Sequence, residues 1–196
     1  MASKSEEKRK LILNKAKKVF IIKGYSGVTM KDIIDECEIS RGGIYLYFSS
    51  VEEIFKEVIK LHNKSKIDNI KSDMEKGKPF NELIDNYFDF QKERFMNMDK
   101  SLKSAMMGFF LEHKNEYSQS FISTQFDNSQ GMVLEILKIG NEKSGISEKN
   151  LLTISENITL FMEGISTMAL FTGLSEEFID RHFKYIKQMI YLNLNL

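Results

Sequence analysis

The sequence predicts an all-α protein, and three observations carry that prediction. Of its 196 residues, 42% are apolar and one, Pro79, is a proline, which is typical of a folded and mainly helical chain. Apolar residues recur at helical spacing along most of the chain. Serine, threonine and glycine residues stand where those helices would begin and end. The length fits one or two domains with a substantial core.

The first expected helix spans residues 8–23. Its apolar face is formed by Ile12, Ala16, Val19 and Phe20. Gly24 ends this helix as the residue after its C-cap. The opposite face is formed by Lys10, Asn14, Lys17 and Lys18. This second face has two interpretations, a solvated surface or a surface that lies along a DNA backbone.

Residues 28–55 contain three helix starts in close succession. The expected N-cap residues are Thr29, Ser40 and Ser50. Asp32 stands three positions after the first of them, and Glu53 stands three positions after the last, where it completes a capping box. Residues 37–40 link the first two short helices. Such a pair is typical of a helix-turn-helix, whose second helix enters the major groove of DNA.

The second of these helices has an unusual composition. It opens with Arg41, Gly42 and Gly43, although each glycine costs about 1 kcal/mol relative to alanine in a helix interior. Two missing Cβ atoms let the backbone of the first turn approach another surface closely. Tyr45 and Tyr47 add hydroxyl donors, and the guanidinium of Arg41 suits either guanine or phosphate. These features favour DNA binding over a simple loop.

Charge separates the N-terminal quarter from the rest of the chain. The whole chain has a net charge of zero. Residues 1–48 hold 10 Lys and Arg against 6 Asp and Glu, a net charge of +4, and the remainder holds 18 against 22, a net charge of −4. The first part therefore has the electrostatic character of a DNA-binding domain.

The same residues carry a family resemblance. The motifs that follow one another in residues 8–55 are I-L-x-x-A-x-x-V-F-x-x-x-G-Y, V-T-M-K-D-I-I, I-S-R-G-G-I-Y-L-Y-F and E-E-I-F. This succession resembles the N-terminal domain of the TetR family of bacterial transcriptional regulators. The resemblance implies a three-helix helix-turn-helix domain at 1–49 and a helical effector-binding and dimerisation domain at 50–196. The residues expected to contact a double-stranded operator are Thr29, Lys31, Ser40, Arg41, Gly42, Gly43, Tyr45 and Tyr47.

Three positions depart from the family pattern. Glu38 stands where the turn usually carries glycine, so either a residue with a side chain adopts the bend there or the turn differs slightly. Residues 49–51 replace a lysine that commonly binds phosphate. Tyr47 replaces a histidine and keeps a hydrogen-bonding tip.

The C-terminal three quarters of the chain are expected to be helical throughout. The predicted helices span residues 50–76, 80–95, 101–111, 117–143, 147–173 and 178–192. The first of these joins the DNA-binding part to the rest, which predicts a rigid connection between them.

Residues 157–175 contain a single charge, Glu163. Their glycines and hydroxyl groups exclude a membrane span in a stretch of this length. A helix that is apolar all round in a water-exposed protein is buried on both sides, so one side is expected to face a second subunit. The expected dimerisation residues are Phe161, Ile165, Met168, Ile179, Phe183, Ile186 and Ile190. The prediction is a homodimer on a pseudo-palindromic operator.

Methionine and aromatic residues concentrate in the middle of the chain. They have two interpretations, the core of a helical domain or an adaptable apolar pocket, and the family resemblance implies a small-molecule site. The residues expected to contact an unidentified effector are Tyr87, Phe88, Gln91, Phe95, Met106, Met107, Phe110, His113, Phe161 and Met162.

Catalysis finds no support in the sequence. It has no glycine-rich phosphate loop, H-E-x-x-H motif or nucleophile elbow, so we expect no enzyme, metal or cofactor. The lone Cys37 excludes an intramolecular disulfide and fits a cytoplasmic protein. The favoured function is a DNA-binding transcriptional repressor released by a small apolar ligand. The alternative is a DNA-binding module whose C-terminal domain docks a protein partner and binds no small ligand.

Overall fold

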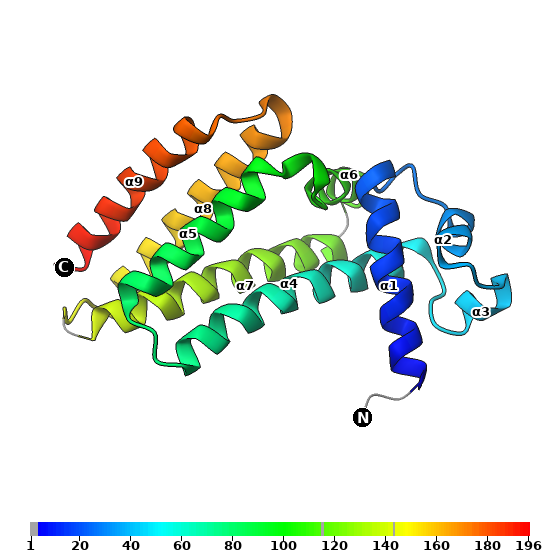
Figure 1. The fold of residues 1–196 in the computed structure, drawn as a ribbon, viewed down its shortest axis with the longest axis horizontal. Coiled ribbons are helices and arrows are strands. Elements are labelled where there is room, and N and C mark those ends of the chain that lie inside the picture. The colour runs from blue at the N-terminus through cyan, green and yellow to red at the C-terminus, as the bar shows by residue number, and fades with distance from the viewer. Residues whose placement is uncertain (1–3, 115, 143) are drawn as a thin grey trace. The chain divides into compact units, whose positions relative to one another are not determined.

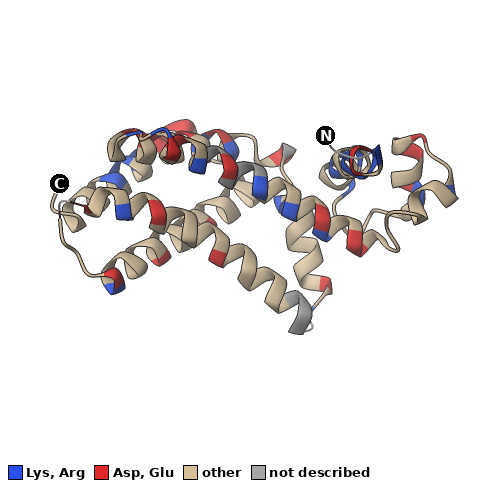
Figure 2. Cartoon of the chain, turned by 90° about the horizontal axis from the view of Figure 1, so that it is seen from below, with Lys and Arg blue, Asp and Glu red and all other residues tan. Residues whose placement is uncertain are grey.

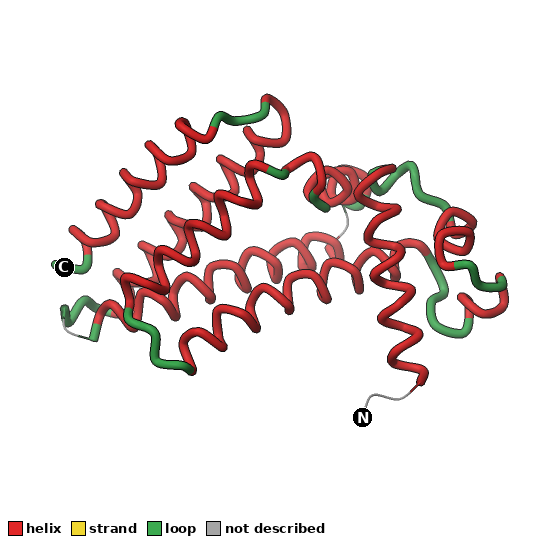
Figure 3. Tube along the Cα trace, viewed as in Figure 1, coloured by secondary structure: helices red, strands yellow, loops and turns green. Residues whose placement is uncertain are grey.

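The computed structural model describes residues 4–114, 116–142 and 144–196, and these contain helices and no strand (Figures 1 and 3). In chain order the elements are α1 (Lys4–Lys23), α2 (Met30–Cys37), α3 (Arg41–Tyr45), α4 (Val51–Glu75), α5 (Phe80–Met96), a 3-10 turn η1 (Met98–Lys100), α6 (Lys103–Glu112), α7 (Glu116–Asn141), α8 (Glu148–Thr172) and α9 (Glu176–Asn193). The all-α prediction is confirmed. Each expected helix is present, and α1 begins at Lys4 instead of Lys8.

The chain divides into two compact units. The first contains residues up to 66 together with 99–114, and the second contains 67–98 and 115–196. This division differs from the domains expected at 1–49 and 50–196. The beginning of α4 and the whole of α6 belong to the first unit because their apolar side chains are buried there.

The core of the first unit is aromatic. The ring of Phe20 lies 4.8 Å from that of Phe55 at an edge-to-face angle, and the ring of Tyr25 lies 4.9 Å from that of Phe109. Phe20, Phe55 and Phe109 are completely buried. Edge-to-face pairs stabilise a core beyond the effect of their buried area, and here they join α1, α4 and α6.

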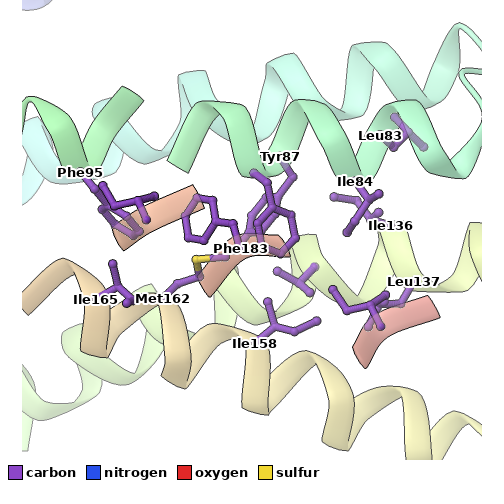
Figure 4. Packing of buried hydrophobic residues seen from close by; sticks show 14 of the residues in the cluster. Leu83, Ile84, Tyr87, Phe95, Ile136, Leu137, Ile158, Met162, Ile165 and Phe183 are labelled. Carbon is purple, nitrogen blue, oxygen red and sulfur yellow. The ribbon is translucent and has the colours of Figure 1, made fainter. Parts of the chain in front are cut away.

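The second unit is a helical bundle of α5, α7, α8 and α9 with the end of α4. Helices α5, α8 and α9 run beside one another in Figure 1, and α5 contacts both of the others. Figure 4 shows the core between them, with Tyr87, Phe183, Met162 and Ile158 pointing inward. The ring of Phe183 lies 4.9 Å from that of Phe88, so α5 and α9 meet through aromatic side chains.

Two apolar stripes of the second unit point outward. On α8 the exposed large apolar residues are Leu152, Leu160, Met168 and Phe171, and on α9 they are Tyr185, Met189 and Leu192. Successive members are three, four or eight positions apart, so each set lies on one side of its helix. No described helix is both long and apolar enough to cross a membrane.

Most of the expected dimerisation residues do not belong to these two exposed stripes. Ile165 on α8 and Ile179, Phe183 and Ile190 on α9 are buried in the core of their own unit. The side of α9 that carries the last three faces α5. Phe161 and Ile186 are partly buried against that core, and Met168 is 51% exposed.

Candidate nucleic-acid interface

The helix-turn-helix begins with a complete capping box at Thr29. Its hydroxyl oxygen accepts a hydrogen bond from the backbone N–H of Asp32 at 3.3 Å, and the Asp32 carboxylate accepts one from the backbone N–H of Thr29 at 2.8 Å. Lys23 pairs with the same carboxylate at 2.6 Å. The Lys23 hydrogen bond and those from Thr29 hold the pKa of Asp32 well below its usual range. The Thr29 side chain therefore serves the helix start.

The turn between α2 and α3 bends at Glu38. Its backbone is left-handed, with φ 55° and ψ 40°, and its N–H donates to the carbonyl oxygens of Asp35 and Ile34. A residue with a side chain therefore takes the bend, which decides between the two alternatives that the sequence left open for this turn. Cys37, just before it, is buried, and burial raises the pKa of its thiol, as expected for a packed residue rather than a reactive one.

Helix α3 is short, and buried side chains hold it against the rest of the first unit. Ser40 caps it, because its hydroxyl oxygen accepts a hydrogen bond from the backbone N–H of Gly43 at 3.1 Å. Ile44 is completely buried, and Phe48 is 1% exposed. No atom lies within 4 Å of the place where a Cβ on Gly42 would stand. The first turn of α3 thus offers open backbone to a second molecule.

The outer face of α3 carries three exposed side chains. Arg41 extends over the ring of Tyr45, with its guanidinium carbon 5.9 Å from the ring centre. Leu46 follows directly and is 82% exposed. Leu46 is not among the residues expected to contact DNA, although it stands between the two tyrosines of the aromatic motif. Tyr47 is half-buried, and Lys31 on α2 is exposed.

Helix α1 also carries basic residues, which are blue in Figure 2. Arg9 pairs with Glu57 at 2.8 Å and lies over the ring of Phe48, and Lys15 pairs with Glu36 at 3.5 Å. Arg9 and Lys15 therefore make contacts that stabilise the first unit. Within the ranges that the structure describes, Lys31 and Arg41 form no ion pair and remain available to an anionic partner.

The start of α4 differs in detail from the predicted capping box. Ser50 accepts from the backbone N–H of Glu53 at 3.1 Å, but the Glu53 carboxylate accepts from the backbone and the hydroxyl of Ser49. The bonds from Ser49 lower the pKa of Glu53. Ser49 and Ser50 therefore share the capping role that was predicted for Ser50 alone. Both belong to residues 49–51, where the family resemblance led us to expect a phosphate-binding lysine.

The residues expected to contact an effector fall into both units. Met106, Met107 and Phe110 lie on α6 and His113 directly follows it, all in the first unit, whereas Tyr87, Phe88, Gln91, Phe95, Phe161 and Met162 lie in the second. His113 is held within the first unit. Its Nδ1–H donates to the carbonyl oxygen of Phe109 at 3.0 Å, and its Nε2 lies 3.4 Å from the hydroxyl oxygen of Tyr25 and 3.8 Å from the carboxylate of Glu52.

The second unit encloses a polar cluster that includes Gln91. The Arg94 guanidinium donates to the Gln91 side-chain oxygen at 2.9 Å and to the Ser166 hydroxyl at 3.4 Å. Burial lowers the pKa of Arg94 and raises that of Tyr87 to about 12. Arg94 and Ser166 are the polar residues that sequence reasoning missed here. The described residues contain no His, Cys, Asp and Glu cluster suited to a metal ion.

Known proteins share both parts of this structure. The fold of the whole chain matches that of NemR from E. coli in its reduced form, with a TM-score of 0.76 and 15% identity over 92% of this chain and 96% of that one. It also matches a TetR family transcriptional regulator from Cytophaga hutchinsonii, with a TM-score of 0.71 and 16% identity over 97% and 96%. These similarities show the fold.

Sequence relatives give the same result most clearly at the N-terminus. The uncharacterised HTH-type transcriptional regulator YfiR of Bacillus subtilis is 56% identical over 48 residues, which span 24% of this chain and 23% of that protein. YdgC, an uncharacterised HTH-type transcriptional regulator of the same organism, is 26% identical over 90% of this chain and 88% of its own. The matched segments span only 23% and 19% of the lengths of the relatives YfiR and YuxN. Residues 12–58 match the model described as bacterial regulatory proteins, tetR family, and the chain therefore carries at its N-terminus the helix-turn-helix domain of the TetR family.

Proposed function

We propose that this protein is a transcriptional repressor that binds an operator through α3 and releases it when a small apolar ligand binds the second unit. The observation that carries the proposal is the outer face of α3. On this face Arg41 and Tyr45 lie close to Gly42, where the missing Cβ leaves the backbone accessible. Ile44 and Phe48 are buried beneath them and hold the segment in place. The residues proposed to contact the operator are Thr29, Lys31, Ser40, Arg41, Gly42, Gly43, Tyr45 and Tyr47.

A homodimer fits this function because two recognition helices then meet two half-sites of a pseudo-palindrome. The exposed stripes of α8 and α9 support this assembly. Gly164 lies exposed between Leu160 and Met168, and no atom lies near the place of its missing Cβ, so a partner helix could approach there closely.

Replacement of Arg41 tests DNA binding. If its guanidinium reads guanine, Arg41→Ala should weaken binding by about 1–3 kcal/mol and relax the preference at one base per half-site. If it holds phosphate, affinity should fall evenly across sequences and the salt slope should shrink by about 0.9. Fluorescence anisotropy against selected and random duplexes at several salt concentrations distinguishes the two.

A matched control is Lys138→Ala, which removes an exposed cation on α7 that pairs with Glu135 at 2.7 Å. It should leave both affinity and salt slope unchanged. If Arg41→Ala changes neither the affinity for DNA nor the salt slope, Arg41 does not contact DNA.

The apolar ligand is supported by the aromatic side chains on α5 and by the polar cluster at Arg94, which could orient one polar group of a mainly apolar compound. The test is operator affinity in the presence of apolar and cationic compounds, since a ligand releases DNA only through its differential affinity for the two states. A coupling of about 1–3 kcal/mol would weaken binding about 5- to 150-fold.

A protein-docking role for the second unit is the other candidate. It is favoured by the close packing of Tyr87, Phe88 and Phe95 in the core, where each is at most 3% exposed. If no compound weakens operator binding and calorimetry of the full chain shows no uptake, docking replaces the ligand-sensing role.

A further inference from the structure

Leu46 is a large apolar side chain in a position where the fold gains nothing from it. It is 82% exposed, whereas Ile44 and Phe48 on either side provide the packing of this segment. Burial of an aliphatic side chain stabilises a fold by about 1.5–3 kcal/mol, and Leu46 forgoes this contribution. Single exposed leucines are common, so the position of the residue decides its meaning.

The backbone places Leu46 on the proposed reading face. It is the C-cap of α3, and its φ of −68° and ψ of −21° continue the right-handed helical path. It stands one, four and five positions after Tyr45, Gly42 and Arg41, which are all exposed. These four residues therefore share one side of the helix, and α3 has no acidic residue in its first turn to repel DNA there.

The chemistry of a leucine side chain limits its partner on DNA. It can neither donate a hydrogen bond nor pair with phosphate. Among the base edges of the major groove, the C5 methyl group of thymine is the apolar feature. An exposed leucine beside Arg41 and Tyr45 is thus complementary to a thymine adjacent to the bases or phosphates that these two residues contact.

We infer that Leu46 contacts the C5 methyl group of a thymine in each operator half-site and so determines part of the base preference. The inference rests on the proposed function and adds a residue that specifies sequence without hydrogen bonding. Loss of one buried methyl group corresponds to about 0.8 kcal/mol, or about a fourfold loss in affinity.

The experiment begins with selection of preferred duplexes from a random pool by the full-length protein. Each thymine of the selected site is then replaced by uracil, which removes only the methyl group. One thymine per half-site should be sensitive in the wild type, with about a fourfold loss, and Leu46→Ala should abolish that sensitivity. Leu46→Met, which keeps an apolar contact, should retain it.

Ile22 on α1 is the matched control, because it is 81% exposed. Ile22→Ala should keep the full uracil effect. Leu46→Ala should also leave the salt slope and the thermal unfolding temperature unchanged, which separates a base contact from a phosphate contact or a structural role.

Two results would overturn the inference and can be told apart. If Leu46→Ala shows the same uracil effects as the wild type at every thymine, DNA binding stands and the assignment of Leu46 fails. If the protein selects no sequence from the pool, the proposed function fails, and the inference fails with it.

Discussion

At the scale of single residues, Glu38 adopts an unfavourable left-handed backbone conformation in the turn between α2 and α3. With φ at 55°, its Cβ lies close to the following carbonyl, which costs about 1–2 kcal/mol for most residues. The turn still forms because α2 and α3 are anchored on both sides of it by Ile33 and Ile44, which are completely buried.

Glu38→Gly should therefore stabilise the protein. Removal of the Cβ relieves the strain, while the extra freedom of glycine in the unfolded chain offsets part of the gain, so we expect an increase of about 0.5–1 kcal/mol in the free energy of unfolding. Chemical denaturation measures it. Glu38→Ala keeps the strain and removes only the charge, and an equal gain in that variant would assign the effect to charge.

Two glycines of α7 should respond in opposite ways to the same substitution. A Cβ on Gly140 would lie 2.7 Å from the Phe80 ring and 3.0 Å from Leu194, whereas nothing lies within 4 Å of a Cβ on Gly131. Gly140→Ala should destabilise by about 1–3 kcal/mol through overpacking, and Gly131→Ala should stabilise by about 1 kcal/mol through helix propensity. Thermal unfolding of both variants checks the signs, and a stabilising Gly140→Ala would contradict the close approach.

At the scale of secondary-structure elements, α6 depends on its neighbours. It is ten residues long, and Leu102 at its N-cap provides no side-chain hydrogen bond, whereas the His113 side chain at its C-cap donates to the carbonyl oxygen of Phe109. Isolated helices of this length are marginal in water. Its stability therefore comes from Phe109, which is completely buried between Tyr25 and Phe55 at ring distances of 4.9 and 5.2 Å.

Phe109→Ala should destabilise the first unit by about 3–5 kcal/mol, because it removes a buried ring and leaves a cavity. Hydrogen exchange should quicken in α1, α6 and the start of α4. Leu111→Ala on the same helix removes a side chain that is 66% exposed, and its exchange should match the wild type. Unchanged protection of α1 in Phe109→Ala would mean that α6 does not support this unit.

At the scale of the whole molecule, the exposed stripes of α8 and α9 decide how two copies could associate. An open groove lies between the two helices and is lined by Phe161, Arg181, His182, Tyr185 and Ile186. Apolar side chains exposed in one contiguous area mark an interaction surface. A second copy would cover the same stripes by symmetry, as in a four-helix interface.

The double variant Met168→Glu and Tyr185→Glu should be monomeric, because both side chains are more than half exposed in the single chain and paired charges would be buried in a symmetric contact. Sedimentation equilibrium measures the mass, and binding to a two-half-site operator should weaken with it. Met96→Glu, an equally apolar exposed position on α5, is the control. An unaltered dimer in the double variant would place the subunit contact elsewhere.

The sequence by itself determined the helices. Thr29 and Ser40 begin their helices through bonds to the third residue that follows, and such bonds depend only on neighbours along the chain. For the same reason the position of Arg41 at the start of α3 could be predicted, together with the residue types around it.

Only the tertiary structure decided which apolar side of a helix faces its own core. On α9 the Ile179 and Phe183 stripe and the Tyr185 and Met189 stripe are both apolar, and contacts with α5 bury the first and leave the second exposed. The same holds for α6, whose methionines suggested an effector pocket and whose Phe109 belongs to the first unit. A helix pattern shows that a face is apolar, but the partner of that face comes from residues distant in the chain, which local periodicity does not specify.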